Sequence, residues 1–149
     1  MTEKIASREI VIFNLGKEKF ALYTDQVKSI EEMQDIVPVP LAPEYLAGLI
    51  NLRGEITTIV DLRRRLHLVE NSRLGPDVVI IIVDYNQETA GLIVDRVDSV
   101  ETIKAVPKDV PDSIKKAANG RFYDKVIEIN REKIIILNLD KILSLEEVK

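Results

Sequence analysis

The chain of 149 residues carries 21 Lys and Arg against 25 Asp and Glu, a net charge of −4, which disfavours a protein whose main partner is nucleic-acid phosphate. Hydrophobic residues make up 46% and charged residues 31%, so the composition excludes a disordered chain and predicts one globular domain. The chain has no cysteine and one histidine, His67, which excludes disulfides, thiolate nucleophiles and metal sites built from Cys or His pairs. We therefore expect neither a metal nor a cofactor.

Strand-forming sequence dominates the chain, because β-branched aliphatic residues are abundant and aromatic residues make up only 5%. Strand-like runs occur at 9–15, 19–23, 27–33, 47–52, 56–60, 77–85, 89–94, 98–103, 125–129 and 133–139. Short turn sequences lie at 16–18, 53–55, 86–88 and 130–132. Each is short enough to join antiparallel neighbours, and the long crossovers typical of a parallel sheet are missing. The pattern predicts an all-β fold with a few short helices.

Three short helices are predicted among these strands, at 61–68, at 111–118 and from about 140 to 148. Asp61 is placed as the N-cap of the first, and Pro111 lies near the first turn of the second. The stretch 35–45 contains three prolines, which predict an extended connection rather than a central strand.

An internal repeat organises the chain. Residues 49–66 match residues 126–143 without a gap, and residues 22–30 match residues 92–100 in the same way. The longer match has the order strand, tight turn, strand, capped helix in both copies. The repeat predicts a single domain, 1–149, made of two similar barrels at approximately 8–70 and 76–143. Each barrel is too small to bury a core of its own well, so a shared core between them is expected.

Two strand-like runs, 78–83 and 134–137, are apolar at every position. A strand with one wet face would alternate, so these strands should be covered on both faces. We therefore predict that Val79, Ile81, Ile135 and Leu137 are buried.

Residues with catalytic or binding chemistry are few. The glycine spacing contains no phosphate-binding loop, and His67 has no second ligand type at helical spacing, so a surface position is expected. Four aspartates stand where strands end, namely Asp25, Asp61, Asp95 and Asp140. Capping is their expected role, with a hydrolase using two of the last three as an alternative. The basic run Arg63–Arg65 gives a second alternative, a small nucleic-acid-binding barrel.

One set of motifs is specific. Pro38-Val39-Pro40 is followed by Gly48-Leu49-Ile50-Asn51-Leu52-Arg53-Gly54-Glu55-Ile56 and by Ile59-Val60-Asp61-Leu62-Arg63. These motifs closely resemble the signature of the CheW family, which couples chemoreceptors to a histidine kinase in bacterial chemotaxis. The likeness extends to residues 91–97 and 135–143 and so covers nearly the whole chain.

The resemblance implies two five-stranded, SH3-like barrels around a shared hydrophobic core, which agrees with the repeat. It implies a non-catalytic adaptor with two partners, the CheW-like regulatory domain of the chemotaxis histidine kinase and the cytoplasmic tip of transmembrane chemoreceptors. Neither nucleic acid nor direct membrane insertion is expected. Residues 1–10 carry charges throughout and no apolar run of signal-peptide length. We therefore expect a cytoplasmic protein that is recruited to membrane-associated receptor arrays.

The resemblance also predicts a receptor-binding groove between the barrels. Carried over by position, its residues are Val27, Ile30, Arg53, Gly91 and Val100. Many family members place a glutamate two positions after the valine that corresponds to Val27, near the signature arginine. This chain has Ser29 there, followed by Glu31 and Glu32. An internal pairing of Arg53 would therefore have to use one of these two glutamates.

Overall fold

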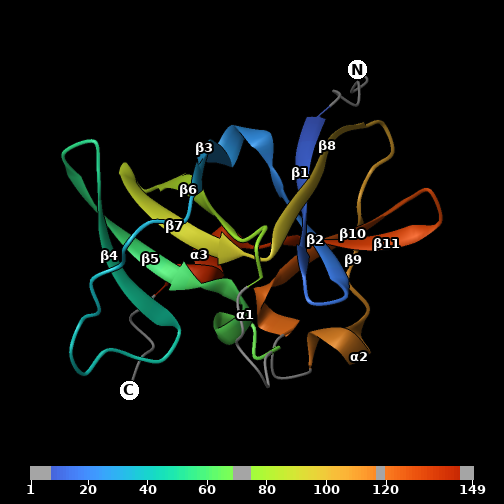
Figure 1. The fold of residues 1–149 in the computed structure, drawn as a ribbon. Coiled ribbons are helices and arrows are strands. Elements are labelled where there is room, and N and C mark those ends of the chain that lie inside the picture. Colours follow the sequence, from blue (N-terminus) through green and yellow to red (C-terminus); the bar gives the residue numbers. More distant parts are fainter. Residues whose placement is uncertain (1–7, 69–74, 117–119, 145–149) are drawn as a thin grey trace.

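The computed structural model describes residues 8–68, 75–116 and 120–144 (Figure 1). All ten predicted strands are present within two residues of their expected bounds, and a short additional strand, β9, was not predicted. The strands are β1 (Arg8–Leu15), β2 (Glu18–Tyr23), β3 (Val27–Glu32), β4 (Leu46–Leu52), β5 (Glu55–Asp61), β6 (Val79–Tyr85), β7 (Glu88–Val94), β8 (Arg96–Ile103), β9 (Lys108–Asp109), β10 (Tyr123–Ile129) and β11 (Glu132–Leu137).

The helices are shorter than predicted. They are η1 (Thr24–Gln26), α1 (Leu62–Arg65), α2 (Asp112–Lys115), η2 (Gly120–Phe122) and α3 (Leu139–Ile142). Helix α1 ends early because His67 has a left-handed backbone with φ 59°. Asp61 caps α1 as predicted, accepting from the Arg64 N–H. The cap of α3 is Asn138, which accepts from the Lys141 N–H at 3.1 Å, and not Asp140. Parts of the predicted helices, 117–118 and 145–148, lie outside the described residues.

The strands form two sheets. The six-stranded sheet has the order β8-β1-β2-β11-β10-β9 and is called sheet A; the five-stranded sheet has the order β3-β6-β7-β5-β4 and is called sheet B. The mostly-β fold class is confirmed, as are the four predicted antiparallel hairpins. The expectation that the sheets contain no parallel pairing was wrong, because β2 pairs with β11 and β5 with β7 in parallel.

The two sheets do not coincide with the two halves of the chain, and the barrel bounds of 8–70 and 76–143 stay a prediction. Strands from Val27 to Val94 make sheet B, whereas sheet A combines β1 and β2 with strands that follow sheet B in sequence. In Figure 1 the blue β1–β2 hairpin accordingly lies beside the orange and red strands β10 and β11. Each parallel pair therefore joins strands from different halves of the chain, and the intervening chain supplies the long connection that parallel pairing needs.

The repeat nevertheless sets the architecture, because it relates sheet A to sheet B. The β1–β2–β8 side of sheet A corresponds to β6–β7–β3 in sheet B, and β11–β10 corresponds to β5–β4. The parallel registers agree as well: Ile135 pairs with Phe20 in sheet A, and their counterparts Thr58 and Ala90 pair in sheet B. The molecule is therefore pseudo-twofold symmetric.

Three clusters of buried side chains fill the fold. One lies within sheet A and includes Ile10 and Ile136, and one lies within sheet B and includes Ile59 and Ile80. The largest joins both sheets and both α1 and α3. It is the predicted shared core. Four residues of the all-apolar strands were predicted to be buried. Ile81 and Leu137 are buried, while Val79 and Ile135 are half-buried and packed against the shared core.

Candidate functional site: the edge strands β3 and β8

Two exposed aliphatic side chains occupy equivalent positions on the two sheets. Ile30 on β3 is 44% exposed and Val100 on β8 is 55% exposed. Their backbone partners, Ile81 and Val11, are also equivalent in the repeat. β3 and β8 are the outermost strands of sheets B and A at corresponding ends, so the site predicted from the resemblance has one apolar anchor on each sheet.

The local sequence explains the outward position of these residues. β3 alternates half-buried and exposed positions along its whole length, which is the pattern of a strand with one packed face. Val27, another predicted site residue, lies on the packed face and contacts the shared core. Lys28 and Glu32 flank Ile30 on the outer face. Such charges protect an edge strand from unspecific pairing.

Arg53 lies at the tip of the β4–β5 hairpin. Arg53 and Gly54 have φ of 51° and 88°, and Asn51 Oδ1 accepts from the Gly54 N–H at 2.8 Å. The Asn-Leu-Arg-Gly sequence therefore forms the hairpin turn and leaves the arginine side chain exposed at its tip. The Arg53 side chain is 68% exposed, and its Nη2 contacts Glu31 Oε2 on β3 at 2.9 Å.

The Arg53–Glu31 contact connects the tip of the β4–β5 hairpin to β3. Ser29 supports it, because its hydroxyl donates to the same Glu31 oxygen at 2.8 Å. Of Glu31 and Glu32, Glu31 is thus the partner of Arg53. Ser29, at the position where many family members have a glutamate, contacts Arg53 only indirectly, through its hydrogen bond to Glu31. The Arg53 side chain, followed by the Ser29 hydroxyl, holds the pKa of Glu31 below its usual value.

We predict that Arg53→Ala raises the pKa of Glu31 toward its usual value, because the largest cause of the lowering is removed. The contact favours the folded state above the usual glutamate pKa and is lost as pH falls through the lowered one. A carboxyl-carbon NMR titration of Glu31 measures this directly. Arg131→Ala, at the matching hairpin of sheet A, is the control and should leave Glu31 unchanged. An unchanged Glu31 titration in Arg53→Ala contradicts the contact.

Gly91, the fifth predicted site residue, is not part of an exposed surface. It is buried in β7, where a Cβ atom would lie 2.6 Å from Ile59 Cδ1 and 2.7 Å from Ile80 Cγ2. Both neighbours belong to the core of sheet B. Gly91 therefore lies in a buried position where close packing requires glycine, whereas Ile30 and Val100 are exposed.

We predict that Gly91→Ala lowers the free energy of unfolding by about 1–3 kcal/mol, the usual cost of overpacking a filled core. Chemical denaturation followed by circular dichroism measures the change. The matched control is Ala21→Gly, at the equivalent position of sheet A. It removes a methyl group where Gly91→Ala adds one. Full stability of Gly91→Ala combined with loss of partner binding would support Gly91 as a site residue and contradict a purely structural role.

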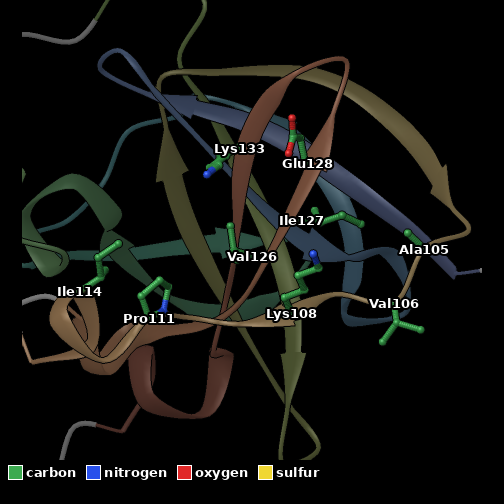
Figure 2. Close-up of a pocket in the computed structure, with 9 residues that line it drawn as sticks. All are labelled: Ala105, Val106, Lys108, Pro111, Ile114, Val126, Ile127, Glu128 and Lys133. Atoms are coloured by element: carbon green, nitrogen blue, oxygen red, sulfur yellow. The ribbon is translucent and has the colours of Figure 1, made fainter.

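The outer edges opposite β3 and β8 carry further exposed apolar residues that the sequence did not single out. On sheet A, Val106 and Ile114 are 60% and 42% exposed and line an open groove of about 370 Å³ beside β9, α2 and β10 (Figure 2). On sheet B, Val37 and Ile56 are 64% and 63% exposed. The Val37 backbone forms a bridge to Leu49 of β4, and the prolines at 38, 40 and 43 follow it in the extended connection predicted from the sequence.

A comparison with family models matches residues 9–147 to the CheW-like domain. The chain belongs to the CheW family. The family comprises chemotaxis scaffolding and coupling proteins, and the motifs around Arg53 had already pointed to it. No helix among the described residues is long and apolar enough to cross a membrane.

Individual relatives agree with the family. The chain is 34% identical over 133 residues to "Chemotaxis protein CheW" of Bacillus subtilis (strain 168), covering 88% of this chain and 85% of that protein. It is 28% identical over 144 residues to the protein of the same name from Treponema pallidum (strain Nichols), covering 95% and 85%. The crystal structure of the scaffolding protein TtCheW from Thermoanaerobacter tengcongensis matches with a TM-score of 0.86 at 29% identity, covering 94% of each chain.

The alternative of a nucleic-acid-binding face at Arg63–Arg65 is not favoured. Arg65 is buried, with 4% exposure. Arg63 contacts Asp95 at 3.4 Å, and Arg64 contacts Asp61 and Glu44 at 3.4 and 3.5 Å. The three arginines therefore do not form a basic surface for phosphate.

Asp61 and Asp95, two aspartates of the hydrolase alternative, and Asp25 make structural contacts. Asp61 is a helix cap, and Asp95 Oδ2 accepts from the Gly16 N–H at 2.6 Å. Asp25 pairs with Arg8 at 3.1 Å. Asp95 and Asp140 line different pockets. Within the described residues, no group of three or more His, Cys, Asp and Glu side chains is placed to hold a metal ion.

Proposed function

We propose that this chain is the adaptor that links the cytoplasmic tip of transmembrane chemoreceptors to the chemotaxis histidine kinase. The observation that carries the proposal is the pair of exposed aliphatic residues, Ile30 and Val100, at equivalent positions on the edge strands of two sheets that share one core. Exposed apolar patches mark sites of protein–protein contact, and we propose that Ile30 and Val100 together form such a contact surface.

The chemistry of the edge-strand site suits a helical ligand. Ile30 and Val100 can desolvate the apolar stripe of an amphipathic helix. Arg53 adds an exposed guanidinium. The hairpin turn fixes the Arg53 backbone, and the contact with Glu31 holds its side chain. A charge-assisted hydrogen bond from it would fix the register of the helix.

The outer edges suit the second partner, the CheW-like regulatory domain of the kinase. The groove of sheet A is apolar, with Lys108, Lys133 and Glu128 among its lining residues. It lies at the β9–β10 end of the sheet, whereas Val100 lies at the β8 end. Receptor and kinase could thus bind at the same time. In this proposal, receptor binding recruits the cytoplasmic protein to membrane-associated receptor arrays.

Co-sedimentation with receptor-containing membranes, with and without the kinase, tests the proposal. We expect the chain to sediment with receptor membranes alone and the kinase to sediment more strongly when the chain is present. Membranes without receptor are the control for unspecific binding. Failure to bind receptor membranes, or binding that does not recruit kinase, contradicts the adaptor role. Salt-dependent retention on a polyanion column would instead support the nucleic-acid alternative.

We predict that Arg53→Ala weakens receptor binding by roughly tenfold or more, as expected for loss of a charge-assisted hydrogen bond. The melting temperature should change little, because Arg53 is exposed and surface ion pairs contribute little to stability. Arg131→Ala, an exposed arginine in the equivalent hairpin of sheet A, should bind like the unchanged protein. Equal binding by both variants shows that Arg53 is only a turn residue. A melting temperature several degrees lower assigns it to folding.

A further inference from the structure

Arg65, at the end of α1, is the buried charged residue of the described chain, with 4% exposure. Its Nε donates to the Ile142 carbonyl oxygen at 2.9 Å, and its Nη2 donates to those of Lys141 and Ser144 at 3.2 and 3.0 Å. The Arg65 guanidinium therefore binds the end of α3, where carbonyl groups have no partner within the helix. A cation is also favoured there by the helix dipole.

Two aromatic rings hold the Arg65 guanidinium in place. Its central carbon lies 4.2 Å from the centre of the Tyr45 ring and 4.9 Å from that of the Phe122 ring. Tyr45 precedes β4 in sheet B and Phe122 precedes β10 in sheet A. The Arg65 side chain thus contacts segments that belong to both sheets.

The repeat shows where this contact lies in the molecule. In the match of 49–66 with 126–143, the counterpart of Arg65 is Ile142, whose carbonyl oxygen accepts the Nε hydrogen bond. A residue that contacts its own counterpart lies beside the pseudo-twofold axis. Arg65 is therefore placed where a single side chain can control how sheet A is oriented relative to sheet B.

We propose that Arg65 is a positioning residue that fixes the orientation of the two sheets and thereby the separation of Ile30 and Val100. Helix α1 follows β5 directly and α3 follows β11 after one residue. β5 and β11 are the strands that form the parallel pairs at the middle of each sheet. A bond between α1 and α3 consequently acts on both sheets near their middles, and Figure 1 shows β3 and β8 above these helices.

The consequence for binding rests on the function proposed above, whereas the consequence for geometry does not. A ligand that contacts both Ile30 and Val100 needs the two side chains at one fixed separation. Without the Arg65 fork, the carbonyl groups at the end of α3 lose these three donors, and the apolar contacts of the shared core remain between the sheets. Apolar contacts are not directional, so the orientation of the sheets becomes less defined.

The test measures the distance between the sheets directly. The chain has no cysteine, so Glu32→Cys and Thr102→Cys place one spin label each on exposed, equivalent positions of β3 and β8. Pulsed electron–electron double resonance then gives the distribution of distances between the two spin labels. We expect Arg65→Met to broaden this distribution, and to shift its mean by more than the width measured with Arg65 present. Affinity for the receptor tip should fall by about tenfold.

Two controls separate positioning from general destabilisation. Arg64→Met removes a neighbouring, partly exposed arginine of the same helix and should leave the distribution unchanged. Ile134→Ala weakens the core of sheet A away from the axis, and should lower the melting temperature without broadening the distribution. Should Arg65→Met fail to fold, Arg65→Lys keeps the cation but not the fork, and the same broadening is expected.

The outcomes are distinct. An unchanged distance distribution in a folded Arg65 variant overturns the positioning role, as does equal broadening in Ile134→Ala. A changed distribution with no receptor binding by the unsubstituted chain leaves the positioning role intact and overturns the adaptor function instead.

Discussion

Replacing Ile30 and Val100 together by aspartate is expected to reduce binding to receptor membranes by roughly a hundredfold or more. Each substitution places a carboxylate where an apolar contact is proposed, and a buried, unpaired charge is costly. The two residues lie on different sheets, so their effects should add. Because both are about half exposed, the melting temperature should stay within a few degrees of its original value. Co-sedimentation and thermal unfolding on the same preparation measure both.

The matched control is the double variant Val106→Asp and Ile114→Asp. These residues are also exposed aliphatics, but they lie at the outer edge of sheet A. We expect this variant to bind receptor membranes normally and to lose kinase recruitment. Loss of receptor binding by both double variants would show that added negative charge alone explains the effect. Normal receptor binding by Ile30→Asp with Val100→Asp would remove the edge-strand site from the proposal.

Gly48→Ala is expected to lower the free energy of unfolding by about 3 kcal/mol or more, through overpacking and backbone strain. Gly48 has φ 145°, and a Cβ atom there would lie 2.8 Å from the carbonyl carbon of Val37 and 2.7 Å from Ile36 Cγ2. The Val37 backbone cannot move away without breaking its bridge to Leu49. The melting temperature should fall by roughly 10 °C for a chain of this size.

Gly16→Ala is the control for Gly48→Ala, because it separates backbone strain from steric overlap. Gly16 also has a positive φ, 63°, but a Cβ atom there would meet nothing within 4 Å. Its substitution should cost only about 1–2 kcal/mol, the strain of a left-handed residue. Equal losses in the two variants would contradict the assigned role of the Val37 backbone.

The sequence was sufficient to predict individual strands and failed to predict how the sheets combine them. Turns such as Arg53–Gly54 are local signals, so the hairpins followed from the sequence. The pairing of β2 with β11 joins Phe20 to Ile135, and no local pattern encodes a partner so distant in sequence. The repeat contained this information only in part, because it identifies equivalent strands but not which of them are neighbours.

The site was predicted in part for similar reasons. The exposed positions of Ile30, Arg53 and Val100 agree with the residues taken from the resemblance, although their role in binding stays a prediction. Gly91 is buried and tightly packed, which the motif did not indicate, and its role in binding also stays a prediction. The repeat also indicated that Arg65 is buried, because its counterpart, Ile142, is apolar. No prediction made use of this observation.

The interleaved sheets impose an order on synthesis. All strands of sheet B lie between Val27 and Val94, so this sheet can pair completely before the remaining chain leaves the ribosome. The β1–β2 hairpin emerges first, yet one side of β2 stays unpaired until β11 has been translated. The nascent chain must therefore keep an apolar hairpin edge from associating with other chains while more than a hundred further residues are made. Slow translation between β7 and β11 lengthens this exposure, so aggregation during expression should depend on translation rate in that segment.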